Sequence, residues 1–101
     1  MSAETMSAPL SAAPALSCFC VEGQDDAGLL PRVLELFAKR GLVPERFFAQ
    51  RSHVSPSRSG RPGLVIDLQV SGFSRAQREI VAESLRQIPL VTAVLTSEKL
   101  S

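Results

Sequence analysis

The residues best suited to chemistry lie in one short stretch, Gln24 to Leu30, where two carboxylates precede a glycine. Asp25 or Asp26 can cap a following helix, because a carboxylate there accepts backbone N–H groups and meets the positive end of the helix dipole. Gly28 has no side chain, so a ligand can approach the backbone closely. The stretch fits an anion or amino-acid site, and it fits an ordinary capped helix equally well.

The other reactive side chains point away from catalysis and from a metal site. Cys18 and Cys20 are the only cysteines, and residues two apart in a strand face the same side. They are poorly placed to bond to each other, and two sulfur atoms make an incomplete metal site. We expect half-buried thiols, and a metal or disulfide shared across a dimer stays open. Adjacent carboxylates without a neighbouring base indicate a helix cap, so we expect no catalytic residue, no enzyme and no cofactor.

Composition limits the class of protein. The 101 residues carry a net charge of +1 and suffice for one small domain, and no strong field attracts nucleic acid or an anionic membrane. No apolar run approaches the ~18 residues of a membrane span. Residues Met1 to Pro14 are rich in Ala, Ser and Pro and lack the positive start of a signal peptide. We expect a dispensable, disordered leader over residues 1–14 and a cytoplasmic location.

The first half of the ordered chain reads as strand, helix, strand. Ala15 to Glu22 alternates as a strand does. The next helix ends at Gly41, and its expected buried stripe is Leu30, Val33, Leu34 and Phe37. A second strand is expected from Val43 to His53, followed by an exposed loop, Val54 to Gly63.

The second half repeats the pattern in the order strand, helix, strand. In the stretch GLVIDLQV, Leu64, Ile66, Leu68 and Val70 should face the core. Ser74 and Gln77 form a capping box for a helix that ends before Pro89. The buried stripe expected for this helix is Ala76, Ile80, Val81, Leu85 and Ile88. A last strand is expected over Leu90 to Ser97.

The order βαββαβ predicts an α+β fold, the ferredoxin-like sandwich with an antiparallel four-stranded sheet and both helices on one face. This fold serves unrelated functions, so residue types must choose among them. An RNA-recognition module needs aromatic rings on its central strands, which GLVIDLQV lacks. The two arginines in the expected loop could contact phosphates, but a few arginines in a Ser- and Gly-rich loop favour a solvated hairpin tip over a nucleic-acid contact. A copper carrier needs Cys-x-x-Cys in the first loop, where this chain has Gln24 to Ala27.

The run Val21 to Gly41 resembles the start of an ACT domain. That family typically reads Asp or Asn, any residue, Pro, Gly, then a Leu- and Val-rich helix that ends in Arg-Gly. Those places are taken here by Asp25, Ala27, Gly28, Leu29 and Leu30. The resemblance extends over the ordered chain, which we take as an ACT-like domain over residues 15–98. It is nearest to the single-ACT small regulatory subunit of acetolactate synthase, an enzyme of branched-chain amino acid synthesis.

The resemblance implies a regulatory module that pairs into a homodimer or higher oligomer, binds an amino-acid effector between subunits and attaches to a large catalytic subunit. The implied ligand-binding residues are Asp25, Asp26, Ala27, Gly28, Leu29, Leu30 and Val43. Two departures matter. Ala27 stands at the position of the motif proline, and Val43 stands where the second strand begins, a position at which the family often has Asn. The alternative is therefore a ligand-free ACT module used for dimerisation or partner binding.

Overall fold

The computed structural model describes residues 15–52 and 63–100, and its elements alternate in the predicted order. They are β2 (Ala15–Gln24), α1 (Leu29–Lys39), β3 (Arg46–Ser52), β4 (Gly63–Ser71), α2 (Arg75–Arg86) and β5 (Val91–Leu100). The expected leader and the expected loop, apart from Gly63, lie outside the described residues.

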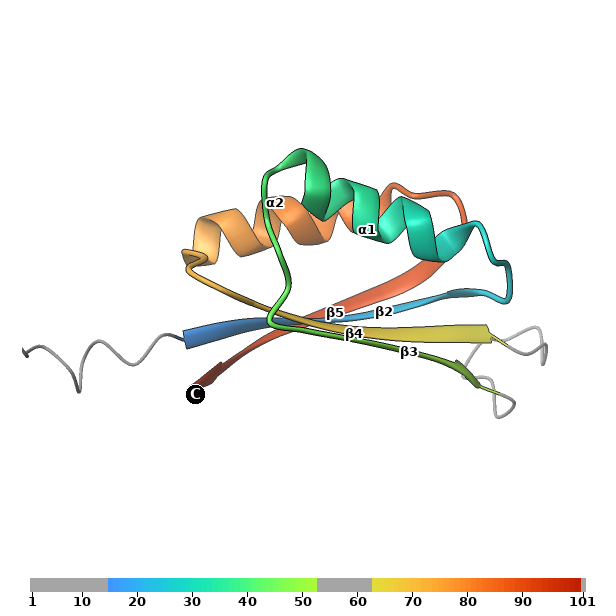
Figure 1. Ribbon diagram of the computed structural model, residues 1–101, viewed down its shortest axis with the longest axis horizontal. Helices are drawn as coiled ribbons and strands as arrows, with labels where there is room; N and C mark the ends of the chain where they lie inside the picture. Colours follow the sequence, from blue (N-terminus) through green and yellow to red (C-terminus); the bar gives the residue numbers. More distant parts are fainter. Residues whose placement is uncertain (1–14, 53–62, 101) are drawn as a thin grey trace, which may run out of the picture.

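The four strands form one antiparallel sheet in the order β3-β4-β2-β5. Both helices cover the same face of this sheet, and none of the elements within residues 15–52 and 63–100 covers the opposite face (Figure 1). The predicted α+β, ferredoxin-like sandwich is thereby confirmed. The two central strands, β4 and β2, run under the helices, while β3 and β5 form the edges.

The core lies between the helices and alternate residues of the strands. Phe19 and Val21 on β2 pair in register with Leu68 and Ile66 on β4, and all four are at most 1% exposed. The ring of Phe37 on α1 meets the ring of Phe19 edge-on, with 5.8 Å between their centroids. The alternation predicted for these strands is therefore correct.

The buried stripes of both helices differ from those expected. Helix α1 buries Leu29, Val33 and Phe37, while Leu34 is 39% exposed. Helix α2 buries Val81, Ala82 and Leu85, while Ile80 is 60% exposed. Each helix meets the sheet along a narrower stripe than its apolar residues would allow, and this leaves Leu34 and Ile80 available for other contacts.

The end of α1 explains why the second strand starts later than expected. Gly41 adopts φ +70°, and Leu42 donates its N–H back to the carbonyl of Phe37 at 3.0 Å, which closes the helix in a Schellman motif. Pairing with β4 begins when the Glu45 N–H donates to the carbonyl of Gln69 at 2.7 Å, so Val43 lies in the connection before β3.

The end of helix α2 agrees with the expectation, and the end of strand β5 differs from it. Helix α2 ends at Arg86, where the N–H groups of Gln87 and Ile88 turn to carbonyls three residues back. A proline disfavours the helical conformation of the residue that precedes it, and this is consistent with a helix that ends ahead of Pro89. Strand β5 continues to Leu100, because its last residues pair with the start of β2.

Candidate functional site

The turn between β2 and α1 is closed by Asp26 rather than left open. The Asp26 side chain accepts a hydrogen bond from the N–H of Gly28 at 2.7 Å. The backbone carbonyl of Asp26 accepts a second one from the N–H of Leu29 at 3.0 Å. The N-cap residue of α1 is Gly28, which receives no side-chain cap, so the expected capping of the helix by a carboxylate is wrong in detail. Two N–H groups that an anion might have used are therefore already bonded.

Asp25 is tied to the edge of the sheet by an ion pair that the sequence did not reveal. The Nε of Arg51 on β3 lies 3.1 Å from the Oδ1 of Asp25. The pairing requires β3 to return beside the turn, and no local motif announces it. Arg32 also lies near this turn: a Cβ built on Gly28 would sit 3.6 Å from its Nη1. The turn thus gathers two carboxylates and two guanidinium groups.

Only some of the predicted ligand-binding residues lie close together in the structure. Asp25, Asp26 and Ala27 are exposed, Gly28 and Leu30 are half-buried, and Leu29 is fully buried in the core. Val43 follows the far end of α1, a helix of 11 residues, so it lies away from the turn within one copy of the chain. A single ligand can contact Val43 and the turn together only if Val43 comes from another copy.

We group three exposed apolar side chains from the stretch that runs from α1 into the edge strand β3. They are Leu34 on α1, Val43 before β3 and Phe47 on β3, with Val43 the most exposed at 84%. An edge strand also presents unpaired backbone N–H and C=O groups. This edge, which we call the β3 edge, therefore combines the two features that favour extension of the sheet by a further strand.

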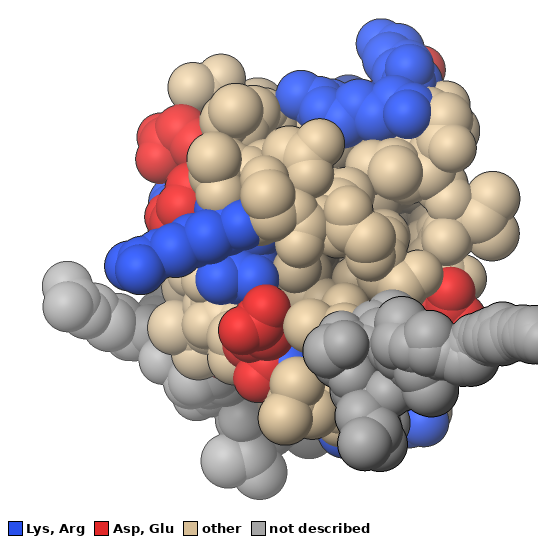
Figure 2. Space-filling view, turned by 90° about the vertical axis from the view of Figure 1, so that its left-hand side faces the viewer, with Lys and Arg blue, Asp and Glu red and all other residues tan. Residues whose placement is uncertain are grey.

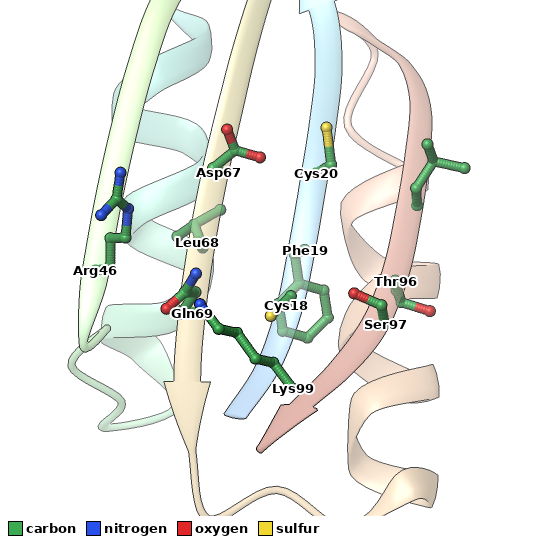
Figure 3. Close-up of a pocket in the computed structure, with 11 residues that line it drawn as sticks. Cys18, Phe19, Cys20, Arg46, Asp67, Leu68, Gln69, Thr96, Ser97 and Lys99 are labelled. Atoms are coloured by element: carbon green, nitrogen blue, oxygen red, sulfur yellow. The ribbon is translucent and has the colours of Figure 1, made fainter. Parts of the chain in front are cut away.

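The open face of the sheet holds a second candidate site, a shallow hollow of about 570 Å³. Cys18 and Cys20 lie at its centre, with Asp67 and Gln69 beside them on β4 and Lys99 reaching over from β5 (Figure 3). Both thiols are free and half-buried, as expected from the sequence. Among the described residues, no three His, Cys, Asp or Glu side chains gather closely enough to hold a metal ion.

The hollow disfavours a reactive thiolate. Burial raises the pKa of the Cys20 thiol, and the neighbouring carboxylates of Asp67 and Glu22 raise it further. The thiol is also hydrogen-bonded to Asp67, which stabilises the protonated form. Cys20 is therefore a thiol near neutral pH, and such a group is a weak nucleophile and a weak metal ligand.

Charges are mixed on the end of the molecule where β2 begins. Figure 2 shows Lys and Arg side chains standing beside Asp and Glu rather than in one basic patch. This end offers no field of one sign for a nucleic acid. In the described parts of the chain, neither helix has the length and apolar character needed to cross a bilayer.

Comparison with known proteins points to one family. A family model described as an ACT-like domain matches residues 10–100, which is most of the chain. A search of curated proteins gave no match.

Solved structures share the fold at low sequence identity. A crystal structure of the ACT domain from GTP pyrophosphokinase of Chlorobium tepidum is 13% identical, with TM-score 0.64, and the match covers 83% of this chain and 99% of that one. A solution structure of the same domain gives TM-score 0.62 at 13% identity, covering 81% and 84%. The C-terminal domain of the MgtC protein from Mycobacterium tuberculosis gives 0.59 at 13% identity, covering 88% and 92%. These likenesses concern the fold alone.

Proposed function

The chain belongs to the ACT-like domain family, and from this we propose that it is a regulatory module that binds an amino acid where two copies meet. In this proposal the turn from Asp25 to Leu30 of one copy faces Val43 of the other. The observation that carries it is the joint presence, at one end of the β3 edge, of carboxylates and guanidinium groups that match both ends of a zwitterion.

The geometry of β3 supplies the pairing. The strand runs from Arg46, near Val43, to Ser52, and the contact between Arg51 and Asp25 places the turn at its far end. If two copies pair β3 with β3 antiparallel around a two-fold axis, the Val43 end of each copy comes beside the turn of the other. The apolar residues of the β3 edge then become covered. The same symmetry produces two equivalent sites.

The charges suit an amino acid better than a simple anion. The side chain of Asp25 accepts one hydrogen bond from Arg51, and a carboxylate offers roughly four acceptor positions, so capacity remains for an ammonium group. Arg32 and Arg51 can receive the α-carboxylate, which offsets the N–H groups already taken by Asp26. The side chain of the ligand would meet Leu30 and the partner's Val43, an apolar pair that favours an aliphatic amino acid.

The first experiment tests the pairing. Light scattering at micromolar concentration is expected to report a dimer or larger, because interfaces of this kind bury over ~1,000 Å². Val43→Glu places a charge in the β3 edge and should shift the chain toward monomer. Ile80→Glu, at another exposed apolar position on α2, is the matched control and should leave the dimer intact. A monomeric wild-type chain of about 11 kDa would refute the pairing.

The second experiment tests the ligand by calorimetry across the common amino acids. Gly28→Asp adds bulk and negative charge at the turn and should abolish binding while the oligomer persists. Ala76→Asp puts the same charge in the first turn of α2, where that residue is exposed, and should bind like wild type. Equal affinity of the Gly28 variant and wild type would move the site elsewhere.

The second candidate function is a ligand-free module for dimerisation or partner binding. It is favoured by two observations, the apolar Val43 where the family often has a polar residue and the bonds from Gly28 and Leu29 to Asp26. A dimer that shows no heat with any amino acid would select this alternative.

We further propose that the module is a cytoplasmic, non-catalytic small regulatory subunit of acetolactate synthase. This assignment comes from the resemblance of the turn and helix α1 in sequence. Adding the chain to the purified catalytic subunit should raise its activity and make the activity sensitive to a branched-chain amino acid. An unchanged activity, with no complex on gel filtration, would remove this partner and leave the regulatory proposal standing.

A further inference from the structure

The edge strand β3 places an aromatic ring and a guanidinium group on the same face of the sheet. Phe47 and Arg51 pair in register with Leu68 and Leu64 on β4, so both point to the side that the helices cover. Phe47 is 37% exposed, and the side chain of Arg51 is 60% exposed although its Nε lies 3.1 Å from Asp25. No further strand within residues 15–52 and 63–100 lies outside β3 (Figure 1). Both side chains therefore have room for a contact from beyond the edge.

The antiparallel pairing of β3 with β3 in the proposed function determines which residues meet. A two-fold axis that reverses the strand passes through the sheet, so it keeps the helices of both copies on one side and sets residues of the same face opposite each other. The register centred on Ala49 pairs all seven residues of the strand, and a shift by two residues leaves two of them unpaired. In the centred register Phe47 of one copy lies opposite Arg51 of the other, with about 5 Å between their Cβ atoms.

We infer that Phe47 completes the amino-acid site of the second copy, where its ring packs on the Arg51 guanidinium and holds this group beside Asp25. The role in the site rests on the proposed function, whereas the contact between ring and guanidinium rests on the strand pairing alone. A guanidinium bonds carboxylates in its own plane and stacks on an aromatic ring across that plane. Asp25 accepts from the Nε of Arg51, so the Nη groups can bond the α-carboxylate of a ligand while the ring covers the flat side.

The chain already contains one contact of this kind. On the open face, the guanidinium of Arg46 lies 5.9 Å from the centroid of the Phe48 ring. The contact inferred for Phe47 and Arg51 has the same chemistry but joins two copies. Since each site then needs a side chain from the other copy, ligand binding and dimer formation stabilise each other. The affinity for an amino acid should therefore fall when the chain is diluted below the Kd of the dimer.

A double-mutant cycle on the dimer tests the contact without any ligand. Phe47→Leu keeps an apolar side chain but removes the ring, and Arg51→Gln removes the cation. An exposed contact of this kind changes affinity about twofold to fivefold and each dimer holds two, so the Kd from sedimentation should show a coupling of about fourfold to 25-fold.

Phe48→Leu is the matched control for this cycle. Phe48 pairs with Asp67 on β4 and lies on the open face, where the centred register sets it opposite Gln50 of the other copy. Its effect on the Kd of the dimer should add to that of Arg51→Gln. Additive effects of Phe47→Leu and Arg51→Gln would overturn the contact, and a wild-type chain that stays monomeric would overturn it together with the pairing.

Calorimetry with L-valine, at chain concentrations above the Kd of the dimer, tests the role in the site. Phe47→Leu should weaken valine binding about twofold to fivefold, and Phe48→Leu should bind like wild type. Equal affinities of the Phe47 variant and wild type would overturn the role of Phe47 in the site while the amino-acid proposal stands. A wild-type dimer that gives no heat would overturn that role together with the valine site, and the cycle decides the contact in either case.

Discussion

The two faces of the sheet show how one strand can serve folding and binding at once. On β2, Phe19 and Val21 face the helices and are at most 1% exposed, while Cys18 and Cys20 between them face outward and stay half-buried. The inward set packs against α1 and α2, and no polar group interrupts it along these residues. The outward thiols lie beside the carboxylate of Asp67 and the amide of Gln69 on β4, and neither α1 nor α2 covers this face (Figure 1).

The contrast shows where the chain has freedom to change. Residues on the covered face are held by packing, because a lost side chain leaves a cavity among neighbours that cannot close it. Residues on the open face are partly in contact with water, so folding constrains their types less. The β3 edge lies between these extremes, since it is exposed in one copy and would be buried in a pair.

The largest expected effect is the loss of stability when a side chain on the covered face is truncated. Phe37→Ala should lower the free energy of unfolding by about 3 to 5 kcal/mol, because Phe37 is 1% exposed and loses its edge-on contact with Phe19. Phe48→Ala, at an aromatic residue on the open face that is 46% exposed, should cost under about 1 kcal/mol. Urea unfolding followed by circular dichroism measures both. Equal losses would mean that a partner buries the open face.

The next largest effect compares the stability cost of adding a methyl group at a buried glycine, Gly23, and at a half-buried one, Gly28. A Cβ on Gly23 would lie 2.5 Å from the Cδ2 of Leu29 and 2.7 Å from the carbonyl oxygen of Leu90, so Gly23→Ala should cost about 1 to 3 kcal/mol. A Cβ on Gly28 meets only the end of the Asp26 side chain within 3.4 Å, and its backbone is already helical, so Gly28→Ala should be close to neutral. Thermal melting compares them, and a greater loss at Gly28 would contradict the turn geometry.

A smaller effect concerns Ser17, the one buried polar residue on the covered face in the described chain. Its hydroxyl accepts a hydrogen bond from Arg78 at 3.2 Å, and the same guanidinium lies 3.8 Å from Glu98. Arg78→Ala should cost about 1 to 2 kcal/mol, because it leaves that hydroxyl buried without its donor. The exposed Arg75→Ala is the control and should change stability by less than about 0.5 kcal/mol. A neutral Arg78 variant would show that water replaces the guanidinium.

The smallest effect tests the open face by pH. The pKa of Cys20 is raised by burial and by Asp67, so the folded chain holds this proton more tightly than the unfolded chain does. Stability is therefore unaffected below the ordinary thiol pKa and falls as pH rises through the raised value. Alkylation with iodoacetamide, followed by mass spectrometry, should label Cys18 before Cys20 at mildly alkaline pH. Asp67→Asn should speed labelling of Cys20, and an unchanged rate would exclude the contribution of Asp67.

Local patterns in the sequence determined the kinds and order of the elements. Alternation in β4 predicted its two faces, the pair Ser74 and Gln77 predicted the capping box at α2, and Gly41 predicted the end of α1, and each is present. These features depend on contacts within a few residues. The family resemblance, based on the run from Val21 to Gly41, also proved correct at the level of the ACT-like family.

Only the tertiary structure decided which residues far apart in sequence became neighbours. The ion pair of Asp25 with Arg51 and the row that joins Arg46 to Gln69 and Ser97 depend on strand order and register. The exposure of Leu34 and Ile80 depends on how each helix is rotated against the sheet. A residue pattern specifies which faces are apolar, but register and rotation come from the packing of all the elements together, because each is set by the fit of side chains across the core.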